Sequence, residues 1–203
     1  MENKIYFNSN GFKIEGMLDK INKARGVVVT HPHPLYGGSM NNQVVESIVS
    51  AYRKNEFTTL RFNFRGVGES SGIYDNGIGE QLDVLSAVSY LDEIGIKRID
   101  LAGYSFGSWV NAQLDLKKFS AGEMVLVSPP VGFLDFSSID SIPCLKLVIT
   151  GGKDEIAPAD MIKSMAYKWN KDARIEIIKG AGHFFTGSFD KLESIISSYL
   201  QEH

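Results

Sequence analysis

The chain of 203 residues has little that would mark a secreted, membrane or nucleic-acid-binding protein. Its one cysteine, Cys144, cannot form an intramolecular disulfide. Its 21 basic and 24 acidic residues are interspersed, so no block of one sign offers a surface for nucleic acid. No apolar run reaches the roughly 18 residues that span a bilayer, and the polar N-terminus lacks the pattern of a signal peptide. We therefore expect a cytoplasmic protein with no nucleic-acid or membrane partner.

Internal repeats, low-complexity blocks and long linkers are also missing from the sequence. The length fits one ordinary domain, which we expect to cover residues 1–203. Cys144 precedes an apolar run, a position typical of a small buried side chain rather than of a nucleophile. Nothing in the sequence indicates the oligomeric state.

Short β-branched and aromatic runs alternate with segments of helical spacing. Alternating residues around Asn10-Gly11 predict a hairpin of 5–7 with 13–18. Further strands are expected at 26–30, 58–64, 99–103, 124–127, 145–150 and 175–178. Helices are expected at 42–54, 80–94, 109–117, 158–169 and 189–200, the second with Leu82, Leu85, Val88 and Leu91 against the sheet. This order predicts a three-layer α/β/α sandwich with a mostly parallel sheet, whose ligands bind where the strands end.

The pattern Gly-x-Ser-x-Gly, typical of a sharp strand-to-helix turn that exposes a nucleophilic serine, occurs twice. The match at 68–72 runs into the turn-like segment 73–77, so no helix is expected to start there. The match at 103–107 directly follows a predicted strand and leads into a predicted helix. Ser105 is therefore the candidate nucleophile, and a glycine-flanked structural turn is the alternative.

A serine nucleophile needs a base and an acid that orients the base. His183, in a glycine-rich loop late in the chain, is the candidate base. Asp154 comes just beyond the end of an apolar strand and is the candidate acid. Asp135, after the preceding strand, is the main competitor for this role. The alternative for Asp154 is a purely structural role at the N-terminus of a helix.

The segment 31–38, after the first buried strand, is expected to supply half of an oxyanion hole. Pro32 and Pro34 have no backbone N–H, which leaves the amides of His31, His33 and Leu35 as donors early in the loop. We favour His33, acting with the amide of Phe106, the residue after the nucleophile. A metal site at His31 and His33 is not favoured, since no third ligand stands nearby.

Together these pieces resemble the α/β-hydrolase superfamily, and more narrowly its small, uncapped, dienelactone-hydrolase-like bacterial esterases. The resemblance covers about residues 26 to 200 and rests on 31–42, 61–70, the Ser105 turn, 151–154 and 182–184. It implies Ser105, Asp154 and His183 as a triad. Two departures stand out: the family's cysteine nucleophile is Ser105 here, and its His-Gly oxyanion motif is His31-Pro32. The segment 128–143 is too short for a full cap domain.

The sequence therefore predicts a serine hydrolase that cleaves small or short-chain esters or thioesters through an acyl-enzyme, without a metal or cofactor. Leu35, Tyr36, Phe133 and Phe184 are expected to line the substrate site. Arg65 could contact an acidic substrate or fix its own loop. The alternative is a non-catalytic ligand-binding protein on the same scaffold. A nucleotide site at Gly66-Val67-Gly68 is not favoured, because no helix follows.

Overall fold

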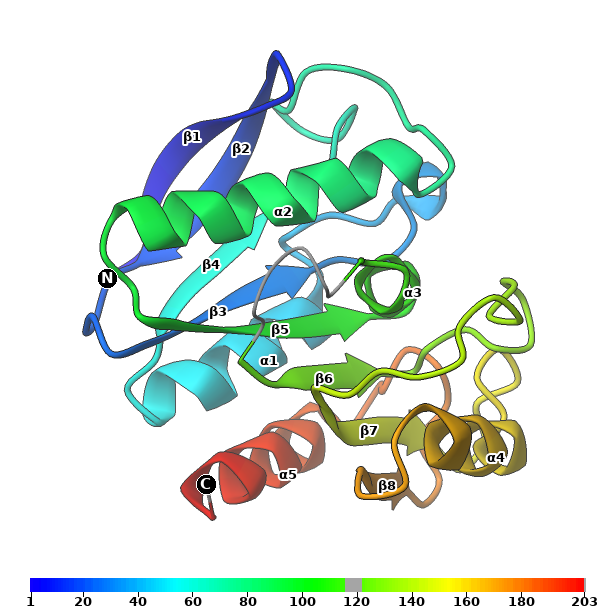
Figure 1. The fold of residues 1–203 in the computed structure, drawn as a ribbon. Helices are drawn as coiled ribbons and strands as arrows, with labels where there is room; N and C mark the ends of the chain where they lie inside the picture. The colour runs from blue at the N-terminus through cyan, green and yellow to red at the C-terminus, as the bar shows by residue number, and fades with distance from the viewer. Residues whose placement is uncertain (116–121, 203) are drawn as a thin grey trace.

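The computed structural model describes residues 1–115 and 122–202, and its centre is one mixed sheet of eight strands (Figure 1). The strands are β1 (Asn3–Ser9), β2 (Phe12–Asp19), β3 (Arg25–Thr30), β4 (Thr58–Phe62), β5 (Arg98–Tyr104), β6 (Met124–Val127), β7 (Leu145–Gly151) and β8 (Arg174–Ile178). They lie in the order β1-β2-β4-β3-β5-β6-β7-β8. β2 pairs antiparallel with β1 and β4, and all other pairs are parallel. The predicted hairpin and parallel sheet are confirmed.

Strand order creates a crevice beside β3 and β5. β3 lies between β4 and β5, and the chain continues from β3 to β4 on one side and from β5 to β6 on the other. The loops that follow β3 and β5 therefore diverge, and open α/β sheets bind ligands at such a switch point. In Figure 1 the arrowheads of β3, β5, β6 and β7 point toward the edge that carries these loops.

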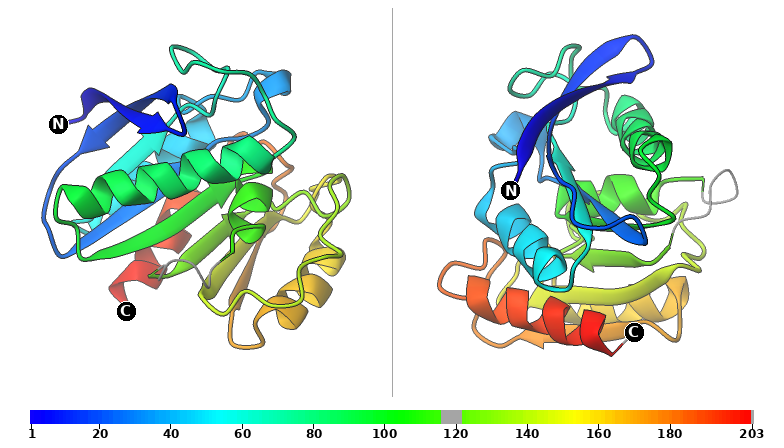
Figure 2. Two further views of the ribbon diagram at one scale, coloured as in Figure 1. Left: turned by 45° about the horizontal axis from the view of Figure 1, so that its top comes forward. Right: turned by 90° about the vertical axis from the view of Figure 1, so that its left-hand side faces the viewer.

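Helices cover both faces of the sheet and make it the middle of three layers. They are α1 (Gln43–Lys54), α2 (Ile78–Glu93), α3 (Phe106–Ala112), α4 (Ala159–Trp169) and α5 (Phe189–Gln201), with a short 3-10 turn η1 (Pro34–Tyr36) before α1. Side chains of α1 and α5 form one apolar core with the sheet, and those of α2, α3 and α4 form another. Figure 2 shows α1 (cyan) and α5 (red) on one face and α2 (green) on the other. Successive β3 residues, such as Val27 and Val28, enter opposite cores, as expected for a strand buried on both faces.

Three expected details differ from the structure. β4 ends at Phe62 rather than at residue 64, because the Phe64 N–H donates to Nε2 of His31 at 3.0 Å instead of to a strand. α3 begins at Phe106, earlier than expected, and ends at Ala112. The last two residues of the helix predicted there, 116 and 117, lie outside the described residues.

The third difference concerns the buried face of α2. Leu82 is 40% exposed, whereas Asp83 and Val84 are buried. Steps of three residues fall short of a helical turn of 3.6 residues, so a row of such steps drifts around the helix. Only Val88 and Leu91, at the end of the predicted row, are fully within the core.

In the part of the chain that the structure describes, no cap covers the edge of the sheet that follows β6. Residues 128–144, between β6 and β7, form only turns and irregular backbone, in agreement with the expected uncapped fold. Among the described helices, none combines the length and the apolar character needed to cross a bilayer.

Candidate active site

Ser105 stands in the sharp turn between β5 and α3. Its φ of 52° and ψ of −118° lie in a region that non-glycine residues seldom adopt, which typically costs about 1–3 kcal/mol. The surrounding structure holds this conformation: the Ser105 N–H donates to the Val127 carbonyl at 2.9 Å, and the Ser105 carbonyl accepts from Trp109 at 3.2 Å. The turn raises the hydroxyl above the end of the sheet, as the predicted strand-turn-helix pattern requires.

The two glycines of the pattern are required by close packing. A Cβ at Gly107 would lie 2.6 Å from the Thr30 carbonyl oxygen, and one at Gly103 would lie 2.7 Å from the Gly107 backbone. The competing match at 68–72 has a structural part instead. Ser70 is buried, and its hydroxyl donates to the Asn63 carbonyl at 2.7 Å and accepts from the Glu15 N–H. No helix starts there.

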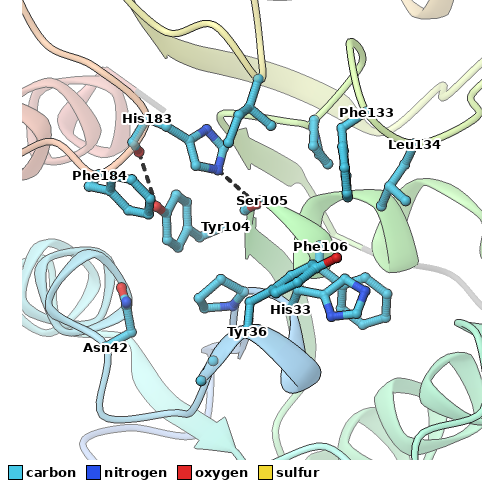
Figure 3. Close-up of a pocket in the computed structure, with 15 residues that line it drawn as sticks. His33, Tyr36, Asn42, Tyr104, Ser105, Phe106, Phe133, Leu134, His183 and Phe184 are labelled. Atoms are coloured by element: carbon cyan, nitrogen blue, oxygen red, sulfur yellow. Dashed lines mark hydrogen bonds between the residues drawn. The ribbon is translucent and has the colours of Figure 1, made fainter.

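The ring of His183 lies between Ser105 and Asp154. Figure 3 shows its bond to Ser105. Its Nε2 lies 2.9 Å from the Ser105 Oγ, and its Nδ1 lies 2.9 Å from the Asp154 Oδ2. The Tyr104 hydroxyl donates to the His183 carbonyl at 3.0 Å and so fixes the loop that carries His183. The three side chains that the sequence singled out thus form one hydrogen-bonded line, although they are far apart in the chain.

Asp154 is oriented by three donors besides His183. Its Oδ1 accepts the backbone N–H groups of Ile156 and Ala157, at 2.9 and 2.8 Å, and its Oδ2 accepts the Ser128 hydroxyl at 2.7 Å. Burial raises the pKa of the Asp154 carboxyl, but the bonds from His183, Ala157 and Ser128 outweigh it and hold the pKa below its usual value. The carboxylate is therefore ionised at neutral pH.

Asp135, the competing acid, lies away from this line. It is exposed, and its carboxylate accepts the Ser137 N–H at 2.8 Å. Ser128, in contrast, was not singled out from the sequence. It directly follows β6, and Asp154 likewise comes shortly after the end of a parallel strand, β7, so a search for polar side chains at strand ends could have found it.

The candidate oxyanion donors are the backbone N–H groups of Phe106 and His33. Phe106 begins α3 and His33 precedes η1, and both residues line the same cavity as Ser105. Within the described residues neither backbone N–H donates to a protein acceptor. The Leu35 N–H, an alternative at the sequence level, is already bound to the Nδ1 of His33 at 3.2 Å. Two uncommitted amides therefore remain near the serine.

The ring of His31 is part of the scaffold rather than of the cavity. It is completely buried, its Nδ1 lies 2.6 Å from the Pro32 carbonyl, and its Nε2 accepts the Phe64 N–H. Burial lowers the pKa of His31 to about 4, which keeps the ring neutral. The His33 ring is likewise engaged, by Leu35 and by the Tyr74 hydroxyl at 3.3 Å. With both nitrogens of each ring in use, this pair does not fit a metal ion.

Arg65 fixes its loop rather than facing the cavity. Its guanidinium pairs with Asp83 at 2.8 Å, and both side chains are buried. Asp83 also accepts the Arg65 N–H and the Ser9 hydroxyl, so one carboxylate ties the loop after β4 to α2 and to β1. Of the two interpretations of Arg65, the structure supports the structural one.

A cavity of about 360 Å³ opens beside Ser105. This volume lies near the lower end of the 300–1,000 Å³ common for small-molecule pockets. Tyr36, Phe133 and Phe184 are among its walls, as expected, but Leu35 is not. Leu35 lines a separate hollow with Arg65, because consecutive side chains of the 3-10 turn η1 point in different directions. The described lining has no Asp, Glu, Lys or Arg side chain.

Comparison with known proteins agrees with this fold. An uncharacterized protein from Rickettsia prowazekii is 35% identical, and the match covers 97% of this chain and 88% of that protein. The structure of an α/β serine hydrolase homologue from Coxiella burnetii is 30% identical, with a TM-score of 0.89 over 98% of this chain and 97% of the other. The chain belongs to the α/β-hydrolase superfamily.

A solved structure that is similar to this chain also lacks a lid. An α/β serine hydrolase without lid from Xanthomonas campestris is 26% identical, with a TM-score of 0.90 over 99% of this chain and 94% of that one. No protein-family profile matches the chain. The α/β-hydrolase fold and its uncapped edge thus agree among sequence, structure and relatives.

Proposed function

We propose that this α/β hydrolase is a serine esterase that cleaves small or short-chain carboxylic esters, or thioesters, through an acyl-enzyme. The observation that carries the proposal is the line from Ser105 Oγ through both nitrogens of His183 to Asp154, with a distance of 2.9 Å at each step. A serine hydroxyl becomes a good nucleophile only when a neighbouring base takes its proton, and this line supplies that base.

In the proposed reaction, Ser105 attacks the ester carbonyl while His183 Nε2 takes the hydroxyl proton. Asp154 holds Nδ1–H toward itself and stabilises the imidazolium that forms. The amides of Phe106 and His33 receive the developing oxyanion, a contribution that typically amounts to about 100- to 1,000-fold per donor. His183 then gives its proton to the departing alkoxide, and water, activated by the same ring, releases the acid and restores Ser105.

The cavity supports a compact, uncharged substrate. Its modest volume and the absence of a cap leave little apolar surface for a long acyl chain. A long chain would speed the reaction only through the binding energy of its remote part, and this cavity offers little of that energy. The uncharged walls of the described lining offer no ion-pair partner for an anionic substrate. Exposed aromatic rings at Tyr36, Phe133 and Phe184 are suited to a small apolar or aromatic group.

The proposal is tested with a fluorophosphonate probe and a series of p-nitrophenyl esters from acetate to dodecanoate. We expect the probe to label the wild-type protein and to spare Ser105→Ala, and kcat/KM to be highest for the short acyl chains. Equal labelling of both proteins would eliminate Ser105 as the nucleophile. Ser70→Ala, a change of the serine in the other Gly-x-Ser-x-Gly match, is the matched control and should remain labelled.

A further inference from the structure

Asn42 is a polar side chain of the cavity that the proposed reaction does not use. It comes just before α1, in the segment after β3, and lines the cavity together with Ser105 and Phe184. It is partly buried. In Figure 3 it lies on the far side of Tyr104 from Ser105, with its amide end directed toward Tyr104 and Phe184.

The orientation of the Asn42 amide is fixed by the helix that follows it. Its Oδ1 accepts the Val44 N–H at 2.9 Å, the usual bond of a residue that caps a helix. The oxygen is therefore committed, and the Nδ2 carries two N–H groups on the other side. Within the described residues that nitrogen has no hydrogen-bond partner.

Other polar side chains of the cavity wall are committed elsewhere. The Tyr104 hydroxyl donates to the His183 carbonyl, and the His33 ring is engaged on both nitrogens. The Tyr36 hydroxyl belongs to a side chain that is 75% exposed, so water can serve it. In a mostly apolar pocket, a few fixed polar groups set the orientation of the ligand. Among the described lining residues outside the triad, Asn42 has a side-chain donor that is fixed in orientation and has no protein partner.

The chemistry of the triad indicates which part of the substrate Asn42 would meet. His183 must give its proton to the leaving oxygen, so the alcohol portion of the ester leaves from the side of His183. In Figure 3, Tyr104, Phe184 and Asn42 lie on one side of Ser105, whereas Phe133 and Leu134 lie on the other. The apolar side suits the acyl group, and the side with Asn42 suits the alcohol.

We propose that Asn42 determines specificity by donating a hydrogen bond to an acceptor oxygen in the alcohol portion of the substrate. The substrate class is then an ester of a small apolar acid with an alcohol that carries an ether or carbonyl oxygen near the ester bond. This inference rests on the proposed esterase function.

The test compares two esters that differ by one atom: n-butyl butanoate and 2-methoxyethyl butanoate, in which an ether oxygen replaces a CH₂ group. The ratio of their kcat/KM values is measured for the wild-type protein and for Asn42→Asp. Aspartate keeps an oxygen to cap α1, so folding is retained, but it removes the donor. We expect the ratio of kcat/KM for the methoxyethyl ester to kcat/KM for the butyl ester to fall about 10-fold in Asn42→Asp. The reason is that the variant loses one hydrogen bond to the ether oxygen and presents two acceptors in place of the donor.

The matched control is Asn41→Asp, which adds the same charge one residue away. Asn41 is exposed, and its Oδ1 accepts from Arg61, a bond that aspartate retains. For Asn41→Asp, the ratio of kcat/KM for the two butanoate esters should equal that of the wild-type protein. Asn42→Ser, which keeps a capping oxygen on a shorter side chain, should lower the ratio in the same direction as Asn42→Asp.

An unchanged ratio in Asn42→Asp, with turnover of both esters, would overturn the inference and leave the esterase proposal intact. A second ester pair, n-butyl methoxyacetate and n-butyl butanoate, carries the same replacement in the acyl group. If Asn42→Asp changes the kcat/KM ratio of this acyl pair and not that of the alcohol pair, the assignment of Asn42 to the alcohol side is overturned. Absence of any Ser105-dependent ester turnover in the wild-type protein would remove both proposals together.

Discussion

Removing the Ser128 hydroxyl tests whether the orientation of Asp154 contributes to catalysis. Ser128 is completely buried, and its Oγ lies 2.7 Å from the Asp154 Oδ2, the oxygen nearer to His183. Ser128→Ala leaves that oxygen with His183 as its remaining partner among the described residues. The Asp154 pKa should rise, because a bond that lowers it is lost.

The expected size follows from the type of bond. A hydrogen bond to a charged group contributes about 1.5–3 kcal/mol to stability. The amides of Ile156 and Ala157 still hold the other carboxylate oxygen, so the loss should lie at the lower end of that range. If the same free energy is lost in the transition state, kcat falls about 10-fold, since 1.4 kcal/mol corresponds to a factor of ten.

The assay combines kcat on p-nitrophenyl butyrate with thermal unfolding. Ser70→Ala is the control, because Ser70 is also a buried serine that donates to an oxygen at 2.7 Å, but away from the triad. Both variants should be less stable than the wild-type protein, and only Ser128→Ala should lose kcat. If kcat of Ser128→Ala stays within about twofold of the wild-type value, or if Ser70→Ala loses as much, the reasoning about Asp154 is refuted.

Two further predictions concern stability. The folded-state pKa of His31 is about 4 against 6.5 for an ordinary histidine, so its contribution to stability is present above pH 6.5 and is lost as the pH falls toward 4, by up to about 3 kcal/mol. Urea unfolding between pH 7 and 4.5 should show a weaker pH dependence for His31→Gln than for the wild-type protein, and parallel curves would contradict this. Gly107→Ala should lower the melting temperature by 10 °C or more, given about 2–4 °C per kcal/mol, because its Cβ would meet the Thr30 backbone. Gly182→Ala, whose Cβ has its nearest neighbour at 3.8 Å, should melt close to the wild-type temperature.

The fold was predictable because each element carries its own local pattern. Buried parallel strands such as β6 are short apolar runs bounded by turns, and Asn10-Gly11 marks the turn of the β1-β2 hairpin. Errors occurred where tertiary contacts decide an end or a face. β4 ends before Phe64, whose N–H donates to His31, and the three-residue spacing on α2 leaves Leu82 exposed while the neighbouring Asp83 is buried against Arg65.

The candidate site was predictable to the extent that chemistry requires rare residue types at strand ends. Ser105, His183 and Asp154 could be found in this way, since strand ends of a parallel sheet share one edge. The wall was less predictable, because whether Leu35 or Tyr36 faces the cavity depends on one turn of η1. Ser128 and Asn42 were not singled out, since a serine after a strand and an asparagine before a helix have ordinary structural explanations.

The sequence by itself determined the order of strands and helices along the chain, the turn that presents Ser105 and the chemical types of the two side chains in line with it. Local backbone preferences and apolar periodicity act over a few residues, so they can be recognised without coordinates. Only the tertiary structure decided that Asp154 rather than Asp135 meets His183, that Arg65 serves its loop and that the Asn42 amide faces the cavity. These outcomes depend on distances between segments far apart in the chain, and packing of the whole sheet sets those distances.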